Sequence, residues 1–220
     1  MSDRPFPAPV PAPDDAPEPA VDAVLYDFGN VLVGWDPYGA FAGLDRRDVD
    51  AFFADVDFLV LNHERDAGAT WADARARVAA SHPHHVALLD RYVEQFPETL
   101  TGPVEGSAEL VRELHDLGLR LYGLTNWSAE LYPHAAPAAP ATTLMRDVLV
   151  SGREGLAKPD PAIFALAIDR FGLDPARTLF TDDSRANIDA AARLGLRTHL
   201  FEDTAGLRAA LRDLGVAVGP

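Results

Sequence analysis

The sequence predicts an α/β fold: a doubly wound parallel sheet with helices on both faces and a small inserted all-helical unit. Short apolar runs alternate with helical segments of ten or more residues from position 105 onward, a pattern typical of parallel sheets covered on both faces. One long helical stretch separates the first apolar run from the others. At 220 residues the chain is long enough for one such domain with a substantial core.

Proline dominates the first residues, at positions 5, 7, 9, 11, 13, 17 and 19. Proline lacks an N–H donor and disfavours helix, so we expect residues 1–20 to form a disordered or polyproline II tail. These prolines also interrupt the apolar segment that a signal peptide would need. Such a tail serves either to dock a proline-recognising partner or to solubilise the chain.

The run VLYDF at residues 24–28 predicts a buried strand that ends at a Gly-Asn turn. Residues 37–102 then show helical patterns at 48–61, 70–81 and 84–96, with Thr70 as an expected N-cap and no convincing strand. We therefore expect residues 21–36 and 103–220 to form the core and residues 37–102 to form the inserted helical unit.

The remaining chain alternates regularly between the two kinds of element. Strands are expected at 119–126, 146–152, 178–183 and 196–201. Helices are expected at 107–118, 161–172, 184–195 and 204–215, with a shorter one after Trp127.

Composition narrows the classes of partner. Lys and Arg total 19 against 34 Asp and Glu, a net charge of −15, so the chain is poorly suited to nonspecific binding of nucleic acid or anionic membranes. With no Cys, disulfides and thiolate chemistry are excluded, which favours a cytoplasmic location. No apolar run approaches the roughly 18 residues typical of a membrane-spanning helix.

Polar residues follow several of the expected strands where those strands end. Each alone is typical of a turn or a helix cap. Together, at one sheet edge, they supply a carboxylate nucleophile, a hydroxyl, a cation and a paired carboxylate, which is what metal-assisted phosphoryl transfer requires. These residues are Asp27, Thr125, Asn126, Lys158, Asp182 and Asp183.

Four motifs carry a resemblance. They are DFGNVL from Asp27, LTN with Thr125, AKPDPAIF with Lys158, and TDDSRANIDAAARLG with Asp182 and Asp183. In this order, over residues 22–214, the sequence resembles the haloacid dehalogenase (HAD) superfamily of aspartate-nucleophile hydrolases, in a subfamily IA-like form with a DxGN first motif. The resemblance implies a Rossmann-like core and a helical cap at residues 37–102.

The resemblance also implies residue roles. Asp27 would attack phosphorus and form an aspartyl phosphate. Asp27, Asp183 and the backbone carbonyl of Gly29 would hold Mg²⁺, with Asp182 acting through water or orienting the waters.

The same resemblance assigns the phosphate contacts. Thr125 and the backbone amide of Asn126 would receive phosphoryl oxygens, and Lys158 would offset the accumulated negative charge.

One position departs from the pattern of the phosphatases, which carry Asp two residues after the nucleophile; here that position is Gly29. We expect Asp36 to substitute as general acid, or else to be only a turn residue before Pro37. A glycine there also fits the haloacid dehalogenases, which displace halide without a proton or a metal. The Asp182-Asp183 pair favours the metal-dependent phosphatase instead.

Caps select substrates in the superfamily that the chain resembles. The segment at residues 62–66 is expected either to turn toward the site, with Arg65 or His63 meeting the substrate's non-reacting end, or to be an exposed helix end with solvated charges. Trp127 and Trp35 are candidates for walls of the pocket. The histidines at 82, 84 and 85 lack a carboxylate at ligand spacing, so no metal site is expected there.

These observations predict an Mg²⁺-dependent phosphatase acting on a small phosphomonoester, with a sugar phosphate as one candidate. The alternatives are a metal-independent 2-haloacid dehalogenase that also uses Asp27, and a catalytically weak binding protein of the same fold. A receiver-type signalling module fits less well, because its acidic pair precedes its phosphoacceptor. The expected partner is a small phosphorylated molecule, and the protein is expected to be a monomer or a homodimer.

Overall fold

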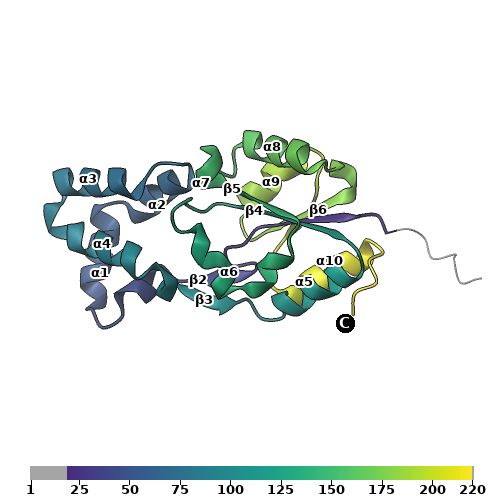
Figure 1. Ribbon diagram of the computed structural model, residues 1–220, viewed down its shortest axis with the longest axis horizontal. Helices are drawn as coiled ribbons and strands as arrows, with labels where there is room; N and C mark the ends of the chain where they lie inside the picture. Colours follow the sequence, from purple (N-terminus) through teal and green to yellow (C-terminus); the bar gives the residue numbers. More distant parts are fainter. Residues whose placement is uncertain (1–18, 220) are drawn as a thin grey trace, which may run out of the picture.

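The computed structural model describes residues 19–219, so nearly all of the expected 1–20 tail lies outside the described residues. A five-stranded parallel sheet forms the centre, in the order β5-β4-β1-β6-β7 (Figure 1). Its strands are β1 (Ala23–Tyr26), β4 (Arg120–Thr125), β5 (Asp147–Val150), β6 (Thr178–Asp182) and β7 (Arg197–Leu200). All five strands agree with the expected runs, and the predicted doubly wound α/β fold is confirmed.

Helices cover both faces of the sheet (Figure 1). On one side lie α5 (Ser107–Asp116) and α10 (Thr204–Asp213), and on the other α8 (Pro161–Phe171) and α9 (Arg185–Arg193). The central strand divides its side chains between two cores: Val24 and Tyr26 belong to one and Ala23 and Leu25 to the other. Because successive strand residues point to opposite faces, β1 is apolar throughout.

Part of the chain between β1 and β4 forms the helical insertion, which we define as residues 37–99. It contains α1 (Arg46–Asp55), α2 (Phe58–Asp66), α3 (Trp71–Ser81) and α4 (Val86–Glu94). The pattern expected as one segment at 48–61 breaks because Asp57 has a left-handed backbone, with φ 48°. Thr70 caps α3 as expected, in a reciprocal capping box with Asp73.

Two short antiparallel strands join the insertion to the core. They are β2 (Val33–Trp35) and β3 (Leu100–Pro103). The sequence analysis found no strand in either place, because segments of three and four residues are too short to show the alternation of a half-buried strand.

The insertion packs against the loop that follows β4. The buried Trp71, at the start of α3, donates from its backbone N–H to Glu130 Oε2 at 2.9 Å and from Nε1 to Ser128 Oγ at 3.2 Å. These two hydrogen bonds connect the insertion to the core at a second place, besides the β2–β3 pair.

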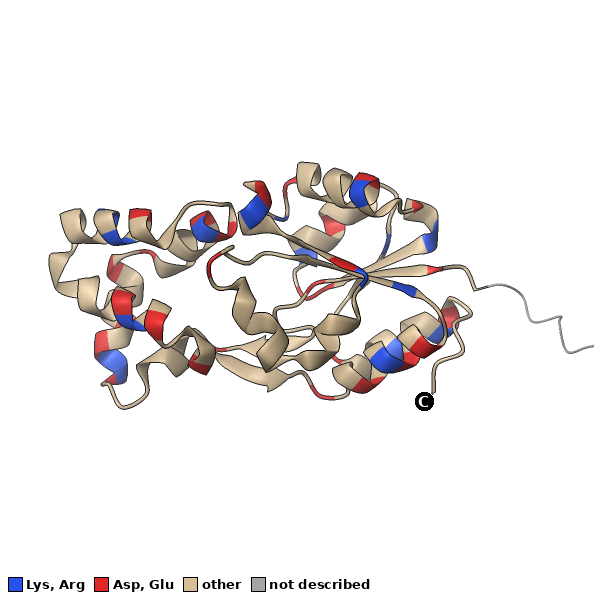
Figure 2. Ribbon diagram, in the orientation of Figure 1, with Lys and Arg blue, Asp and Glu red and all other residues tan. Residues whose placement is uncertain are grey.

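Charge is spread over both parts of the molecule. Figure 2 shows acidic and basic positions interspersed along the helices of the core and of the insertion. Between residues 19 and 219, no helix combines the length and the apolar character that crossing a bilayer requires.

Candidate active site

Asp27, Lys158 and Asp182 form a buried ionic triad at the carboxyl end of β1. The Asp27 backbone N–H donates to the Thr181 carbonyl at 3.0 Å, which fixes the residue beside β6. The Lys158 ammonium lies 2.8 Å from Asp27 Oδ1 and 2.6 Å from Asp182 Oδ2. The structure therefore brings together three of the residues expected to act in phosphoryl transfer.

The charges of this triad do not cancel. Burial is the largest influence on Asp27 and raises the pKa of its carboxyl to about 7, against the opposing effect of Lys158 and with further upward contributions from Asp182 and Asp183. Burial works against the charged form of Lys158, but Asp27 and Asp182 outweigh it and raise the pKa of the ammonium group. One cation between two carboxylates leaves an uncompensated negative charge, which a second cation would neutralise.

Asp182 is fully engaged by protein donors. Its Oδ1 accepts from the Ser184 N–H at 2.8 Å and from Asn187 Nδ2 at 2.9 Å. Its Oδ2 accepts from Lys158 Nζ and, at 3.0 Å, from Asn187 Nδ2. Asp182 thus orients the lysine, and its oxygens are less open to a metal than those of Asp27 and Asp183.

The carboxylates fit a divalent cation. Asp27, Asp182 and Asp183 each place an oxygen within 4.8 Å of the others. Asp183 is exposed, and its Oδ2 accepts from Asn30 Nδ2 at 3.3 Å. A set of hard oxygen donors with excess negative charge suits Mg²⁺.

The carboxyl end of β4 supplies two neighbouring residues, Thr125 and Asn126, with different roles. Thr125 ends β4, and its buried hydroxyl has no hydrogen-bond partner among the described residues. Asn126 instead uses its side chain on the backbone of Lys158: the Lys158 N–H donates to Oδ1 at 2.8 Å, and Nδ2 donates to the Lys158 carbonyl at 2.9 Å. The sequence analysis missed this positioning role, because it depends on a contact between segments 32 residues apart.

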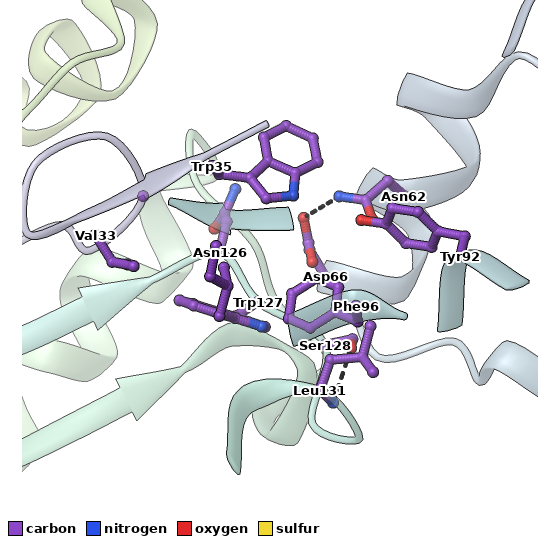
Figure 3. A pocket seen from close by; sticks show the side chains of 12 residues that line it. Val33, Trp35, Asn62, Asp66, Tyr92, Phe96, Asn126, Trp127, Ser128 and Leu131 are labelled. Atoms are coloured by element: carbon purple, nitrogen blue, oxygen red, sulfur yellow. Dashed lines mark hydrogen bonds between the residues drawn. The ribbon is translucent and has the colours of Figure 1, made fainter. Parts of the chain in front are cut away.

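A cavity of about 120 Å³ lies between the site and the insertion (Figure 3). Gly29, Asn126 and the expected Trp127 line it from the core, and α2 contributes from the opposite side. A Cβ built on Gly29 would meet no atom within 4 Å. The remaining lining residues are Val33, Trp35, Asn62, Asp66, Tyr92, Phe96, Leu100, Ser128 and Leu131.

Three residues expected near the substrate do not line this cavity. Asp36 is exposed, and its side chain accepts from the Tyr38 N–H at 3.0 Å to cap a short 3-10 helix, so the turn interpretation is the one the geometry supports. His63 is exposed on α2, and Arg65 is buried beside Glu64. Residues four apart share one helix face, and on α2 that face carries Asn62 and Asp66. The expected 62–66 segment therefore does reach the cavity, but through its two end residues and not through His63 or Arg65.

Comparison with known proteins agrees with this geometry. A family model described as haloacid dehalogenase-like hydrolase matches residues 21–195. Over 183 residues the chain is 24% identical to the sesquiterpene phosphatase astK of Aspergillus oryzae, covering 79% of this chain and 86% of the relative. Over 111 residues it is 26% identical to (S)-2-haloacid dehalogenase 4A of Burkholderia cepacia, covering 50% and 47%. The chain spans about half or less of the length of the first curated relatives that it matches.

A solved structure shares the fold. It is that of a HAD family enzyme from Bacteroides thetaiotaomicron in complex with magnesium and inorganic phosphate, with a TM-score of 0.67 at 23% identity, covering 85% of this chain and 98% of that one. The family model, which matches most of the chain, confirms the resemblance to the HAD superfamily: the chain belongs to the haloacid dehalogenase-like hydrolase family.

Proposed function

We propose that this protein is an Mg²⁺-dependent phosphatase that hydrolyses a small phosphomonoester through an aspartyl phosphate on Asp27. The observation that carries the proposal is the buried Lys158 ammonium between Asp27 and Asp182, with an Asp183 oxygen within 4.8 Å of those of both aspartates. Excess carboxylate charge at a lysine suits a site that takes up a metal cation together with a phosphate dianion.

The chain's own residues supply most of the chemistry. An Asp27 carboxylate oxygen attacks phosphorus, the bond from phosphorus to the ester oxygen breaks, and water then hydrolyses the acyl phosphate. Lys158, the Thr125 hydroxyl and the Asn126 backbone N–H offset charge on the phosphoryl oxygens. A bound Mg²⁺, held by Asp27, Asp183 and the Gly29 carbonyl, would neutralise further negative charge and orient the phosphate.

The helical insertion acts as the cap that selects the substrate. It contributes Tyr92 and Phe96 to a cavity whose other aromatic walls are Trp35 and Trp127. An aryl group, or the C–H face of a sugar, packs well on such rings. These walls favour a leaving group with an apolar face, so aryl, terpenoid and sugar phosphates make up the first substrate panel.

The relatives support this class of reaction. One is named a phosphatase and aligns over most of both chains, and a structure of the same fold was solved with magnesium and phosphate. A second candidate, metal-independent dehalogenation on Asp27, is favoured by Gly29 and by the relative named a haloacid dehalogenase.

One assay separates the two candidates. Phosphate release from p-nitrophenyl phosphate is measured with Mg²⁺ and with EDTA, in parallel with halide release from 2-chloropropionate. We expect Mg²⁺-dependent phosphate release that is abolished in Asp27→Asn and unchanged in Asp48→Asn, an exposed residue of α1. EDTA-insensitive halide release without phosphate release would replace the phosphatase by the dehalogenase.

A further inference from the structure

Asp66 places a carboxyl group in the cavity from the insertion side. It is the last residue of α2, and Figure 3 shows its side chain reaching into the cavity toward Trp35. Asn62, one turn earlier on the same helix face, donates from Nδ2 to Asp66 Oδ2 at 3.3 Å. Among the described residues that line the cavity, Asp66 is the one carboxylic acid.

The surroundings of Asp66 favour proton exchange near neutral pH. Burial is the largest influence and, with the negative charge of Asp27, raises the pKa of Asp66 to about 7. The Ser128 backbone N–H and the positive charges of Lys158 and Arg65 act in the opposite direction. A general acid that must also return as a base works best with a pKa in this range.

The core offers no such group at the position two residues after the nucleophile. Two residues after Asp27 the chain has Gly29, which cannot transfer a proton, although it lines the same cavity as Asp66. Asp36, the substitute expected from the sequence, faces solvent and is occupied as a helix cap. Consider a substrate that binds with its phosphorus at Asp27 and its organic group in the cavity. Its ester oxygen then lies between the Gly29 wall and the Asp66 wall of that cavity.

We propose that Asp66 is the general acid and base of the reaction, supplied by the insertion in place of the residue that Gly29 replaces. This rests on the proposed phosphatase function. As Asp27 attacks phosphorus, the neutral Asp66 carboxyl gives its proton to the departing ester oxygen, which leaves as an alcohol. The resulting carboxylate then takes a proton from the water that attacks the aspartyl phosphate, which releases phosphate and restores both side chains.

The test varies the leaving group while keeping its size similar. p-Nitrophenolate leaves without a proton, whereas the alkoxide from 2-phenylethyl phosphate needs one. We expect Asp66→Asn to lose about 10²- to 10⁴-fold in the rate of alcohol release from 2-phenylethyl phosphate. It should keep a near-normal initial burst of p-nitrophenolate and then accumulate phosphorylated enzyme, detectable by intact mass. Asp66→Glu, which retains an acid, should recover part of the loss, and Asp48→Asn should behave as wild type.

Equal losses in the initial release of the leaving group from both substrates, or no loss on 2-phenylethyl phosphate, would overturn the role of Asp66. The pH dependence of the rate of alcohol release adds an independent readout. The wild-type rate should fall at high pH as Asp66 loses its proton, and this fall should be absent in Asp66→Asn. Wild-type protein that releases no phosphate from either ester, with Mg²⁺ present, contradicts the proposed phosphatase function instead. The two failures are therefore distinguishable.

A separate cluster on the insertion carries a second, independent inference. Asp55 at the end of α1 and His84 and His85 before α4 each offer a ligand atom, and these atoms lie within 4.8 Å of one another. His85 Nε2 is 2.8 Å from Asp55 Oδ2. The sequence analysis expected no metal here for want of a carboxylate; Asp55, from another helix, corrects that reasoning.

The geometry points to a site for a borderline divalent metal such as Zn²⁺, which would tie α1 to the start of α4. Two imidazoles and one carboxylate suit Zn²⁺, and unlike the carboxylate set around Asp27 they disfavour Mg²⁺. His84 and Asp55 are exposed, so a metal can reach them, while His85 is buried and held in place. None of the three lines the cavity.

Calorimetric titration of the full chain with Zn²⁺, in excess Mg²⁺ to occupy the catalytic carboxylates, tests this site. We expect one saturable Zn²⁺ whose affinity falls by at least roughly tenfold in His84→Gln and in Asp55→Asn. Asp27→Asn and His115→Gln, an exposed histidine outside the cluster, should leave it unchanged. Absence of saturable binding, or binding that neither cluster variant weakens, would refute the site.

Discussion

Asn126 and Lys158 hold each other through two reciprocal hydrogen bonds, of 2.8 and 2.9 Å, between the amide side chain of one and the backbone of the other. The residue that follows Thr125 therefore sets the position of Lys158, whose ammonium group faces Asp27. Asn126 is a positioning residue in this respect.

We expect Asn126→Ala to reduce kcat more than it raises KM, because the lysine ammonium would shift relative to Asp27. Loss of a group that orients a catalytic residue typically costs about 10- to 100-fold. Steady-state kinetics on p-nitrophenyl phosphate measure the two constants. A rise in KM with unchanged kcat would mean that Asn126 contributes only binding.

Asp182 should matter for stability as well as for rate. Replacing it with Ala leaves the buried Lys158 with one carboxylate and leaves the Asn187 amide without its acceptor. Lys158 stays paired with Asp27, so the cost comes mainly from buried donors that lose their acceptor, which typically amounts to about 1–3 kcal/mol. Urea unfolding of Asp182→Ala checks this expectation, with Asp189→Ala, an exposed position on α9, as the control.

Gly29 offers a gain-of-function prediction. A Cβ there meets nothing within 4 Å, so an aspartate side chain has room at the cavity wall. If Asp66 supplies the proton in the natural protein, Gly29→Asp should restore much of the activity that Asp66→Asn loses on 2-phenylethyl phosphate. Gly29→Asn, which has the same size but no exchangeable acid, is the matched control and should restore none.

Magnesium binding should depend on pH with a definite sign. The carboxyl of Asp27 has an ordinary value of 3.8, and the folded protein raises its pKa to about 7. Without metal, the folded state keeps a proton that the unfolded chain releases, so this group makes stability fall as pH rises between those two values. Mg²⁺ competes with that proton, and the rise in Tm that it causes should be larger at about pH 8 than at about pH 6.

Thermal unfolding at several pH values with and without Mg²⁺ measures this effect. Asp27→Asn removes the titrating ligand, and its response to Mg²⁺ should be small and nearly independent of pH. A larger rise in Tm at the lower pH would contradict the assignment of Asp27 as a metal ligand.

Much of the fold follows from local sequence. Apolar runs such as Val24-Leu25 are strands because both faces of a central parallel strand are buried, and that signal needs no knowledge of neighbours. The site residues at the ends of these strands were predictable for the same reason, since parallel strands bring their carboxyl ends to one edge.

The missed features depend on contacts between distant segments. Asp66 could be placed in the cavity only once the rotation of α2 about its axis was known, and the break at Asp57 fixes where that helix starts. The contact of Asp55 with His85 likewise joins two residues that lie 30 positions apart, one at the end of α1 and one just before α4. Asp36 and Asp66 are the same type of residue, so the sequence alone does not distinguish them. In the structure Asp36 is exposed, whereas Asp66 is half-buried and lines the cavity.

The antiparallel pairing of β2 with β3 shows how the insertion is connected to the core. Val33 lies opposite Pro103 in that pair, so the chain leaves the core and returns to it at adjacent points. In topological terms, all four helices of the insertion are the loop of a single β-hairpin. Loops of that kind can be lengthened, shortened or exchanged without changing the order of the strands they connect. The cavity walls that the insertion supplies can therefore diversify while the sheet edge that carries Asp27 stays the same.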